Sequence, residues 1–289
     1  GDTIDVSSLA DKRYYMVLGN GINTGGVIDI NQRFGSTTID TGNNYARRQS
    51  INGGSTATSA SRSNIDSSID GAVNHFMVSY IANKSDKEKL VQSFYTEGNA
   101  TGAGSTPERS ETVGKWTNTS NPIDIMRLYN TQAGDYTTGS ECVVLGWDPS
   151  DTHTTNFWEE LVDTSWSSGS SVETSAFATK KYLWYQGWFK TGGSMSGSYS
   201  ALQVGSGGTI STSGYAERYS INGATDGTDT NSANMYGLVG QGNDGSGNEL
   251  TFINGFIINN SANEKLFITH SAGFNPTTGA GSAPNRTEG

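Results

Sequence analysis

The chain of 289 residues has one cysteine, three histidines and five prolines. The lone cysteine, Cys142, leaves no internal disulfide to hold the fold, and we interpret it as a small buried hydrophobic residue in the apolar run that ends at Trp147. The histidines are far apart in the sequence and form no HExxH-type pair. These scarcities argue against a disulfide-stabilised scaffold and against a histidine-based zinc enzyme.

Long apolar runs and clusters of positive charge are also missing. No stretch approaches the roughly 20 apolar residues of a membrane-spanning helix. The formal net charge is −10, and no basic stripe of the kind that binds nucleic acid or an anionic membrane is present. We therefore expect no nucleic acid among the partners and no insertion into a membrane.

Glycine and small neutral polar residues are abundant. The chain contains 38 glycines, and its residues are 10% aromatic but only 16% charged. Ser, Thr and Asn suit the exposed faces and turns of sheets, whereas long amphipathic helices need more Ala, Leu, Glu and Lys. Hairpin signals occur at Asn52-Gly53 and Asn222-Gly223. The composition predicts an all-β protein.

An internal duplication is the most informative feature of the sequence. Four blocks return in the same order: residues 12–14 as 180–182, 44–53 as 214–223, 88–90 as 264–266, and 101–109 as 278–286. The longest match pairs NYARRQSING with GYAERYSING. The repeat is far longer than the roughly 20–50 residues of a solenoid unit. It predicts two tandem antiparallel β-sandwich domains of jelly-roll-like form, at residues 1–148 and 149–289.

The second copy is shorter than the first. Gly289 aligns with Thr112, whereas the first copy continues to Trp147. An incomplete sandwich exposes apolar faces and unpaired strand edges. We therefore expect the missing strands to come from further chain or from a neighbouring subunit, and both alternatives stay open.

Short runs of alternating apolar and polar residues between turn signals predict the individual strands. In the first copy we expect strands near residues 13–19, 26–32, 45–51, 74–82, 88–96, 112–117, 123–130 and 140–147. In the second copy we expect them near residues 181–189, 198–204, 215–221, 233–240, 250–259 and 264–270.

No catalytic motif stands out, so we expect neither an enzyme nor a cofactor. The chain has no Gly-x-Ser-x-Gly elbow and no phosphate-binding loop. Asp226, Asp229 and Asp244 lie in oxygen-rich loops that are weak candidates for calcium, but the full EF-hand spacing is missing. Ordinary hairpin loops explain these three residues more simply.

The aromatic run 182–189 (YLWYQGWF) offers the candidate interaction residues Trp184, Tyr185 and Trp188. Both faces of a strand with this sequence are apolar, which is typical of a strand buried on both sides. Three interpretations stay open for these residues: the core of the domain, an interface between domains or subunits, and a stacking platform for sugars.

Four arginines occupy matched positions in the two copies: Arg48 with Arg218, and Arg109 with Arg286. Retention in both copies indicates a shared structural role. We expect these arginines to pair with Glu111 and Glu288 or to bond loop carbonyls.

The aligned copies share the pattern Lys-[Arg/Lys]-Tyr, Tyr-Ala-x-Arg-x-Ser-Ile-Asn-Gly, Glu-Lys-Leu and Thr-Gly-Ala-Gly-Ser-x-Pro-x-Arg-x-Glu. The pattern resembles the repeat-bearing structural proteins of viruses and tailed phages of marine microbes. The resemblance implies a location in the virion, with partners that are further copies of the chain and other virion proteins. Capsid, decoration, tail and fibre roles all agree with it.

Two other functions compete with a virion structural protein. One is a glycan-binding adhesin, for which exposed coplanar aromatic residues with polar neighbours are expected. The other is a subunit of a non-viral surface layer or filament, located at the extracellular surface. The sequence does not separate these alternatives, because apolar residues of an interface and of a core look alike in strands.

Overall fold

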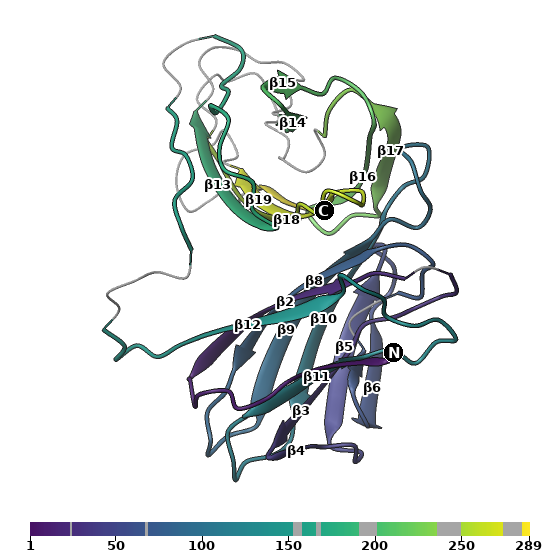
Figure 1. Ribbon diagram of the computed structural model, residues 1–289, viewed down its shortest axis with the longest axis vertical. Coiled ribbons are helices and arrows are strands. Elements are labelled where there is room, and N and C mark those ends of the chain that lie inside the picture. Colours follow the sequence, from purple (N-terminus) through teal and green to yellow (C-terminus); the bar gives the residue numbers. More distant parts are fainter. Residues whose placement is uncertain are drawn as a thin grey trace.

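The computed structural model describes residues 1–23, 25–66, 69–152, 158–165, 169–190, 201–235, 250–273 and 285–289. All regular secondary structure in these residues is β, as the composition predicts, and it comprises strands β1 to β20. The same residues include no helix with the length and hydrophobicity of a membrane span. The strands form two tandem antiparallel β-sandwich domains (Figure 1).

Two sheets build the first domain. The seven-stranded sheet runs in the order β12 (Glu141–Trp147), β2 (Tyr14–Gly21), β8 (His75–Ala82), β9 (Lys89–Glu97), β10 (Glu108–Trp116), β5 (Tyr45–Ile51) and β6 (Ala57–Arg62). The five-stranded sheet runs in the order β1 (Thr3–Val6), β11 (Ile125–Tyr129), β3 (Asn31–Ser36) and β4 (Thr38–Ile39), with β7 (Ile65–Asp66) also paired to β3.

The core of the first domain lies between these two sheets. Alternate residues of a strand point to opposite faces, so Tyr15 and Val17 of β2 and Met77 and Ile81 of β8 enter this core. The residues between them point away from the core. We call the side of the seven-stranded sheet that they form its outer face, and we use the same term for the matching side of the large sheet in the second domain.

The second domain repeats this plan. Its six-stranded sheet runs in the order β13 (Tyr182–Lys190), β18 (Leu250–Ile258), β19 (Leu266–Gly273), β20 (Asn285–Glu288), β16 (Tyr215–Ile221) and β17 (Gly227–Ser232). A small hairpin consists of β14 (Gly205–Ser206) and β15 (Thr209–Ile210). Tyr215 and Met235 form a compact core with Leu202, Val204 and Phe267 on the inner side of the sheet.

The strand order of the duplication is the same in both domains. The series β2-β8-β9-β10-β5-β6 corresponds to β13-β18-β19-β20-β16-β17. The pairing register also repeats, because Leu18 lies opposite Val78 and their counterparts Gln186 and Asn254 lie opposite each other. β12 extends the first sheet beyond β2, and among the described residues no strand takes the matching place beside β13.

A buried tyrosine bonds the backbone of a distant segment in the same way in each copy. The Tyr45 hydroxyl lies 3.0 Å from the backbone nitrogen of Phe34 and 2.9 Å from its carbonyl oxygen. The Tyr215 hydroxyl makes the corresponding two bonds with Val204, both at 2.9 Å. Since the two tyrosines occupy matched positions of the longest repeated block, the sequence duplication coincides with a duplicated hydrogen-bond hub.

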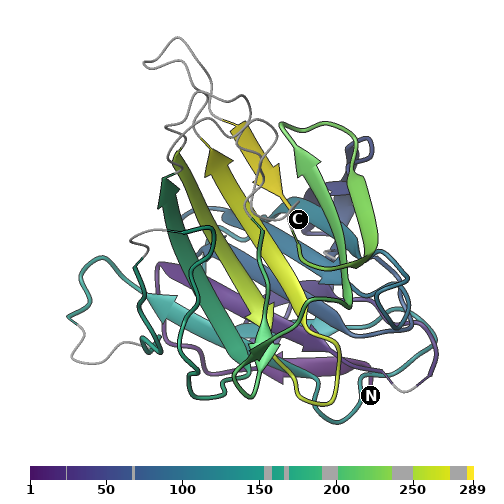
Figure 2. The same cartoon turned by 90° about the horizontal axis from the view of Figure 1, so that it is seen from above.

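The two domains pack outer face against outer face, and Figures 1 and 2 show the six-stranded sheet lying across the seven-stranded one. Buried apolar residues of both domains form one continuous cluster: Met16, Leu18, Phe76 and Val78 from the first domain, and Phe256, Ile258, Leu266 and Ile268 from the second. Burial of such side chains contributes about 1.5–3 kcal/mol each, so the contact holds the domains together as one unit.

Several expected strands need correction. The strand expected at residues 26–32 lies at Asn31–Ser36, with only an isolated bridge at Ile28. The strand expected at 112–117 begins four residues earlier, at Glu108. Of the strands expected at 198–204 and 233–240, the described parts contain a single bridge between Leu202 and Met235. This bridge corresponds to the pairing of β3 with β7, and the remaining residues lie outside the described part of the chain.

Candidate interaction surfaces

A set of exposed side chains covers the outer face of the second domain, beside the contact with the first. We call it the tryptophan face, and it consists of the exposed Trp184, Gln186, Trp188 and Phe252 with the half-buried Asn254. Trp188 is 65% exposed, and Trp184 and Phe252 are 43% and 45% exposed. Isolated exposed apolar residues are common, but contiguous apolar patches mark interaction sites.

The pairing of β13 with β18 creates this face. Trp184 lies opposite Phe256 and Trp188 lies opposite Phe252, so residues four apart on each strand point to one side. The rings of Trp184 and Phe256 stack with centroids 6.0 Å apart. Trp184 donates its indole N–H to Asn254 Oδ1 at 2.7 Å. These contacts hold the Trp184 ring in a fixed orientation.

Tyr185, the third aromatic candidate of the sequence, points to the opposite side of β13. Its hydroxyl lies 2.5 Å from Thr269 Oγ1, and its ring covers Gly255, where a Cβ atom would collide with it. Tyr185 therefore lies on the inner side of the six-stranded sheet and is separate from the tryptophan face.

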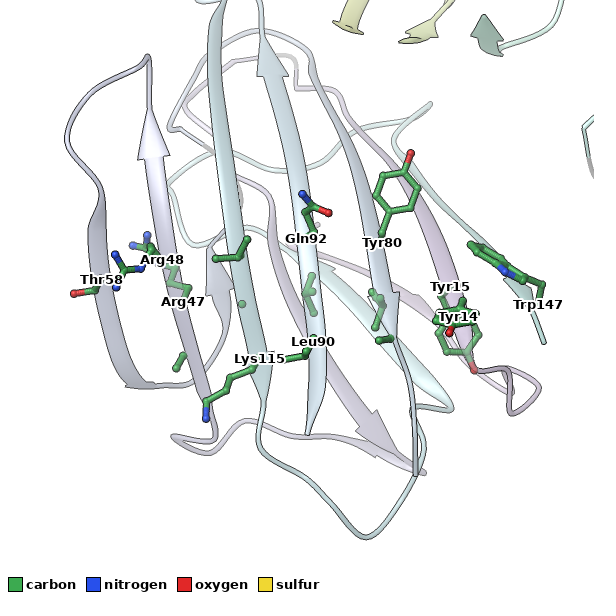
Figure 3. A pocket seen from close by; sticks show the side chains of 16 residues that line it. Tyr14, Tyr15, Arg47, Arg48, Thr58, Tyr80, Leu90, Gln92, Lys115 and Trp147 are labelled. Carbon is green, nitrogen blue, oxygen red and sulfur yellow. The ribbon is translucent and has the colours of Figure 1, made fainter. Parts of the chain in front are cut away.

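A groove of about 800 Å³ lies on the uncovered part of the outer face of the first domain. We call it the first-domain groove; Figure 3 shows its side chains, which come from neighbouring strands of one sheet. Its lining includes Tyr14, Tyr80, Leu90, Val113, Lys115 and Trp147. Leu90 and Val113 are at least half exposed. The first domain thus also carries an open apolar surface, and sequence reasoning had placed none there.

The matched arginines differ in their surroundings. Arg48 is exposed and lines the first-domain groove, whereas Arg218 donates to the carbonyl oxygen of Pro107 in the first domain at 2.8 Å. Arg109 donates to Glu111 at 2.9 Å and makes a two-point contact with Asp226, at 3.1 and 2.7 Å. Arg109 and Arg218 thus join the two domains, and Arg48 does not take part.

A glycine turn makes room for the Arg109–Asp226 pair. Asn52 and Gly53 adopt positive φ angles of 50° and 68°, as expected for an Asn-Gly hairpin. Asp226 packs against Gly53, where a Cβ atom would overlap with its carboxylate. The Asp226 side chain is only 2% exposed, so Arg109 neutralises a carboxylate that is almost fully withdrawn from water.

This ion pair bears on the weak calcium candidates. Both carboxylate oxygens of Asp226 already accept hydrogen bonds from Arg109, which a cation would have to displace. Asp229 lies within β17, opposite Glu217. Asp244 lies outside the described residues. The structure does not bring Asp226 and Asp229 together as a ligand set.

An acidic cluster that sequence reasoning had not recognised as a possible metal site lies at the same junction. Ligand atoms of Glu111, His270 and Glu288 lie within 4.8 Å of one another. Burial, followed by the nearby Glu111 carboxylate, raises the pKa of Glu288 to about 7, and burial lowers the pKa of His270 to about 4. Arg109 and Arg286 donate to the two carboxylates. The raised pKa favours a protonated Glu288 carboxyl beside the Glu111 carboxylate.

The two members of the matched pair Phe94 and His270 also meet at this junction, with ring centroids 4.3 Å apart. Phe94 lies opposite Glu111 in the seven-stranded sheet, and His270 lies opposite Glu288 in the six-stranded sheet. The match of residues 88–90 with 264–266 extends along the strand to Phe94 and His270, but only the fold shows that the two copies touch here.

Comparisons with known protein families, with curated proteins and with solved structures give no match. A function for this chain is therefore inferred from the two surfaces and the junction described above.

Proposed function

We propose that this chain is a structural subunit of a virion, which builds its assembly from contacts between β-sandwich faces. The observation that carries the proposal is a pair of open apolar surfaces, the tryptophan face and the first-domain groove, on the same sheet faces that pack together between the domains. Large apolar patches on a soluble protein mark association surfaces. The resemblance of the repeated motifs to virion proteins favours this setting over a cellular surface layer.

Electron micrographs of the native particle test this proposal. Immunogold labelling with an antibody against the chain is expected to decorate each particle or filament at many regularly spaced positions. A pre-immune serum provides the control. Finding the chain only as free protein, with unlabelled particles in the same preparation, would contradict a structural role.

A glycan-binding adhesin is the second candidate function, since the tryptophan face combines exposed indole rings with the amides of Gln186 and Asn254. Aromatic rings with polar neighbours are able to stack sugars. However, Asn254 Oδ1 already accepts from Trp184 and, at 3.2 Å, from Gln186. Binding to a glycan array that disappears in Trp188→Ala would favour this function over assembly.

A further inference from the structure

The interdomain contact uses opposite ends of the same face in the two copies. In the first domain the buried residues lie in the middle of β2 and at the start of β8. In the second domain they lie toward the end of β18 and the start of β19. Because the strand order and register repeat, each covered position has an identifiable counterpart in the other copy.

The covered positions of the first domain are open in the second. The buried set is Met16, Leu18, Phe76 and Val78, and its counterparts are Trp184, Gln186, Phe252 and Asn254. Trp184, Gln186 and Phe252 are exposed, and Asn254 is half-buried. These four residues belong to the tryptophan face.

The covered positions of the second domain are, in turn, uncovered in the first. This set is Tyr182, Ile258, Leu266 and Ile268, and its counterparts are Tyr14, Ala82, Leu90 and Gln92. All four counterparts line the first-domain groove. Leu266 is buried by the contact, whereas its counterpart Leu90 is 58% exposed.

Two non-equivalent patches of one repeated face therefore meet inside the chain. Among the described residues, the other domain leaves one patch of each kind uncovered, and the Trp158 ring lies beside Trp184 with centroids 5.5 Å apart. A heterologous contact of this type leaves one unused surface at each end. Further copies can therefore extend it into a ring or a filament. Tyr80 with Phe256 and Phe94 with His270 lie near the middle of the face and are shared by both patches. The free surfaces are those that lie beyond this shared centre.

We propose that copies of this chain associate head to tail, with the tryptophan face of one chain docked in the first-domain groove of the next. The inference rests on the proposed structural role, and it identifies the two surfaces through which the subunits would assemble. The partner is a second copy, because the contact continues an interface that the two domains already make between the same faces.

The chemistry of the two surfaces is compatible. The tryptophan face contributes aromatic rings and neutral amides and no ionised side chain. The groove contributes mainly apolar side chains, together with Arg47, Arg48 and Lys115. Arg47 is paired with Asp66 at 2.9 Å. Lys115 is paired with Glu88 at 2.9 Å, and Arg48 is available for the face of an indole ring. Burial of the tryptophan face in such a contact therefore leaves no unpaired charge on that face.

Two charge insertions test the proposal. Trp188→Glu alters the tryptophan face and Leu90→Glu alters the groove, and both side chains are mostly exposed, so the fold is expected to persist. Sedimentation velocity from about 1 μM to about 1 mM is expected to show growth of the wild type beyond a dimer. Each variant should associate about 30-fold or more weakly, as expected when an anchor of an interface is lost. Circular dichroism checks that both variants are folded.

A mixture of the two variants is the decisive sample. Each variant retains one intact surface, so a head-to-tail contact predicts that the mixture forms a dimer with one chain of each kind and grows no further. A contact between identical surfaces predicts no rescue. Phe177→Glu and Ile51→Glu place the same charge at exposed apolar residues outside both surfaces and should behave as the wild type.

Three outcomes overturn the proposal: a wild type that stays monomeric over the whole range, variants that associate like the wild type, or a mixture that stays monomeric. The structural role is judged separately by the labelling of particles. If particles carry the chain while both variants still associate normally, the head-to-tail contact fails and the structural role stands. If particles lack the chain while the mixture forms its dimer, the reverse holds.

Discussion

The two domains share one strand order and one hydrogen-bond hub, yet they differ on the outer face of their large sheets. Leu18 and Val78 form an apolar cross-strand pair that the second domain covers, whereas Gln186 and Asn254 form an amide pair in the open. The hub tyrosines Tyr45 and Tyr215 remain the same. The two copies thus have the same residue at the tyrosine position that builds the fold. They have different residues at the outer-face positions that the other domain covers in only one of them.

The matched arginines provide the sharpest test of this comparison. Arg109→Ala removes the guanidinium that bonds both carboxylate oxygens of buried Asp226 and leaves only Arg218, at 3.9 Å, and we expect it to lower the free energy of unfolding by about 3–5 kcal/mol. The counterpart Arg286→Ala removes a side chain that is 59% exposed, and we expect a loss below about 1 kcal/mol. Urea unfolding of both variants measures the difference.

Equal losses at the two arginines would show that the copies do not differ at this junction. The double variant Arg109→Ala with Asp226→Ala serves as the control, because it removes both charges together. We expect it to be more stable than Arg109→Ala alone, since an unpaired buried carboxylate costs more than an absent pair.

The tyrosine hubs test where the two copies are alike. Tyr45→Phe and Tyr215→Phe each remove a hydroxyl that bonds a backbone N–H and a carbonyl, and each should cost about 1–3 kcal/mol. Thermal unfolding followed by tryptophan fluorescence compares the two variants. Tyr14→Phe, at an exposed tyrosine of β2, serves as the control, and its free energy of unfolding should stay within about 0.5 kcal/mol of that of the wild type. A large loss at only one hub would break the equivalence of the copies.

Strands that lie in apolar runs or in the repeated blocks were predictable from the sequence. β5, β8, β9, β12 and β16 lie within a residue or two of their expected positions. The edge strands β6 and β17 were missed, because their sequences ATSASR and GTDTNS contain no apolar alternation. Such strands are specified by pairing with β5 and β16 rather than by burial of one face.

The surfaces were harder to predict than the strands. Alternation places Trp184 and Tyr185 on opposite sides of a strand, but it does not tell which side a second sheet covers. The Arg109–Asp226 pair joins residues 117 positions apart, and no local pattern links them. The first-domain groove combines single residues from several strands, so it exists only once the sheet is assembled.

The acidic cluster tests the junction through pH. The folded pKa of Glu288, about 7, lies above its ordinary value of 4.5, so the folded state holds a proton that the unfolded state releases. The contribution of this group to stability is present below about pH 4.5 and is lost as the pH rises toward 7. His270 and His75, with folded pKa values lowered to about 4, act in the opposite direction, because stability falls as the pH drops below about 6.5.

Comparison of Glu288→Gln with the wild type isolates this one group. The variant cannot ionise, so we expect equal stability near pH 4 and a gain for the variant of roughly 1–3 kcal/mol near pH 8, because the pKa of Glu288 rises from 4.5 to about 7 on folding and each pKa unit is worth about 1.4 kcal/mol. Urea unfolding at the two pH values measures the gain, and Glu160→Gln, at an exposed residue between the domains, should show none. A gain of the same size at both pH values would mean that Glu288 does not titrate in this range.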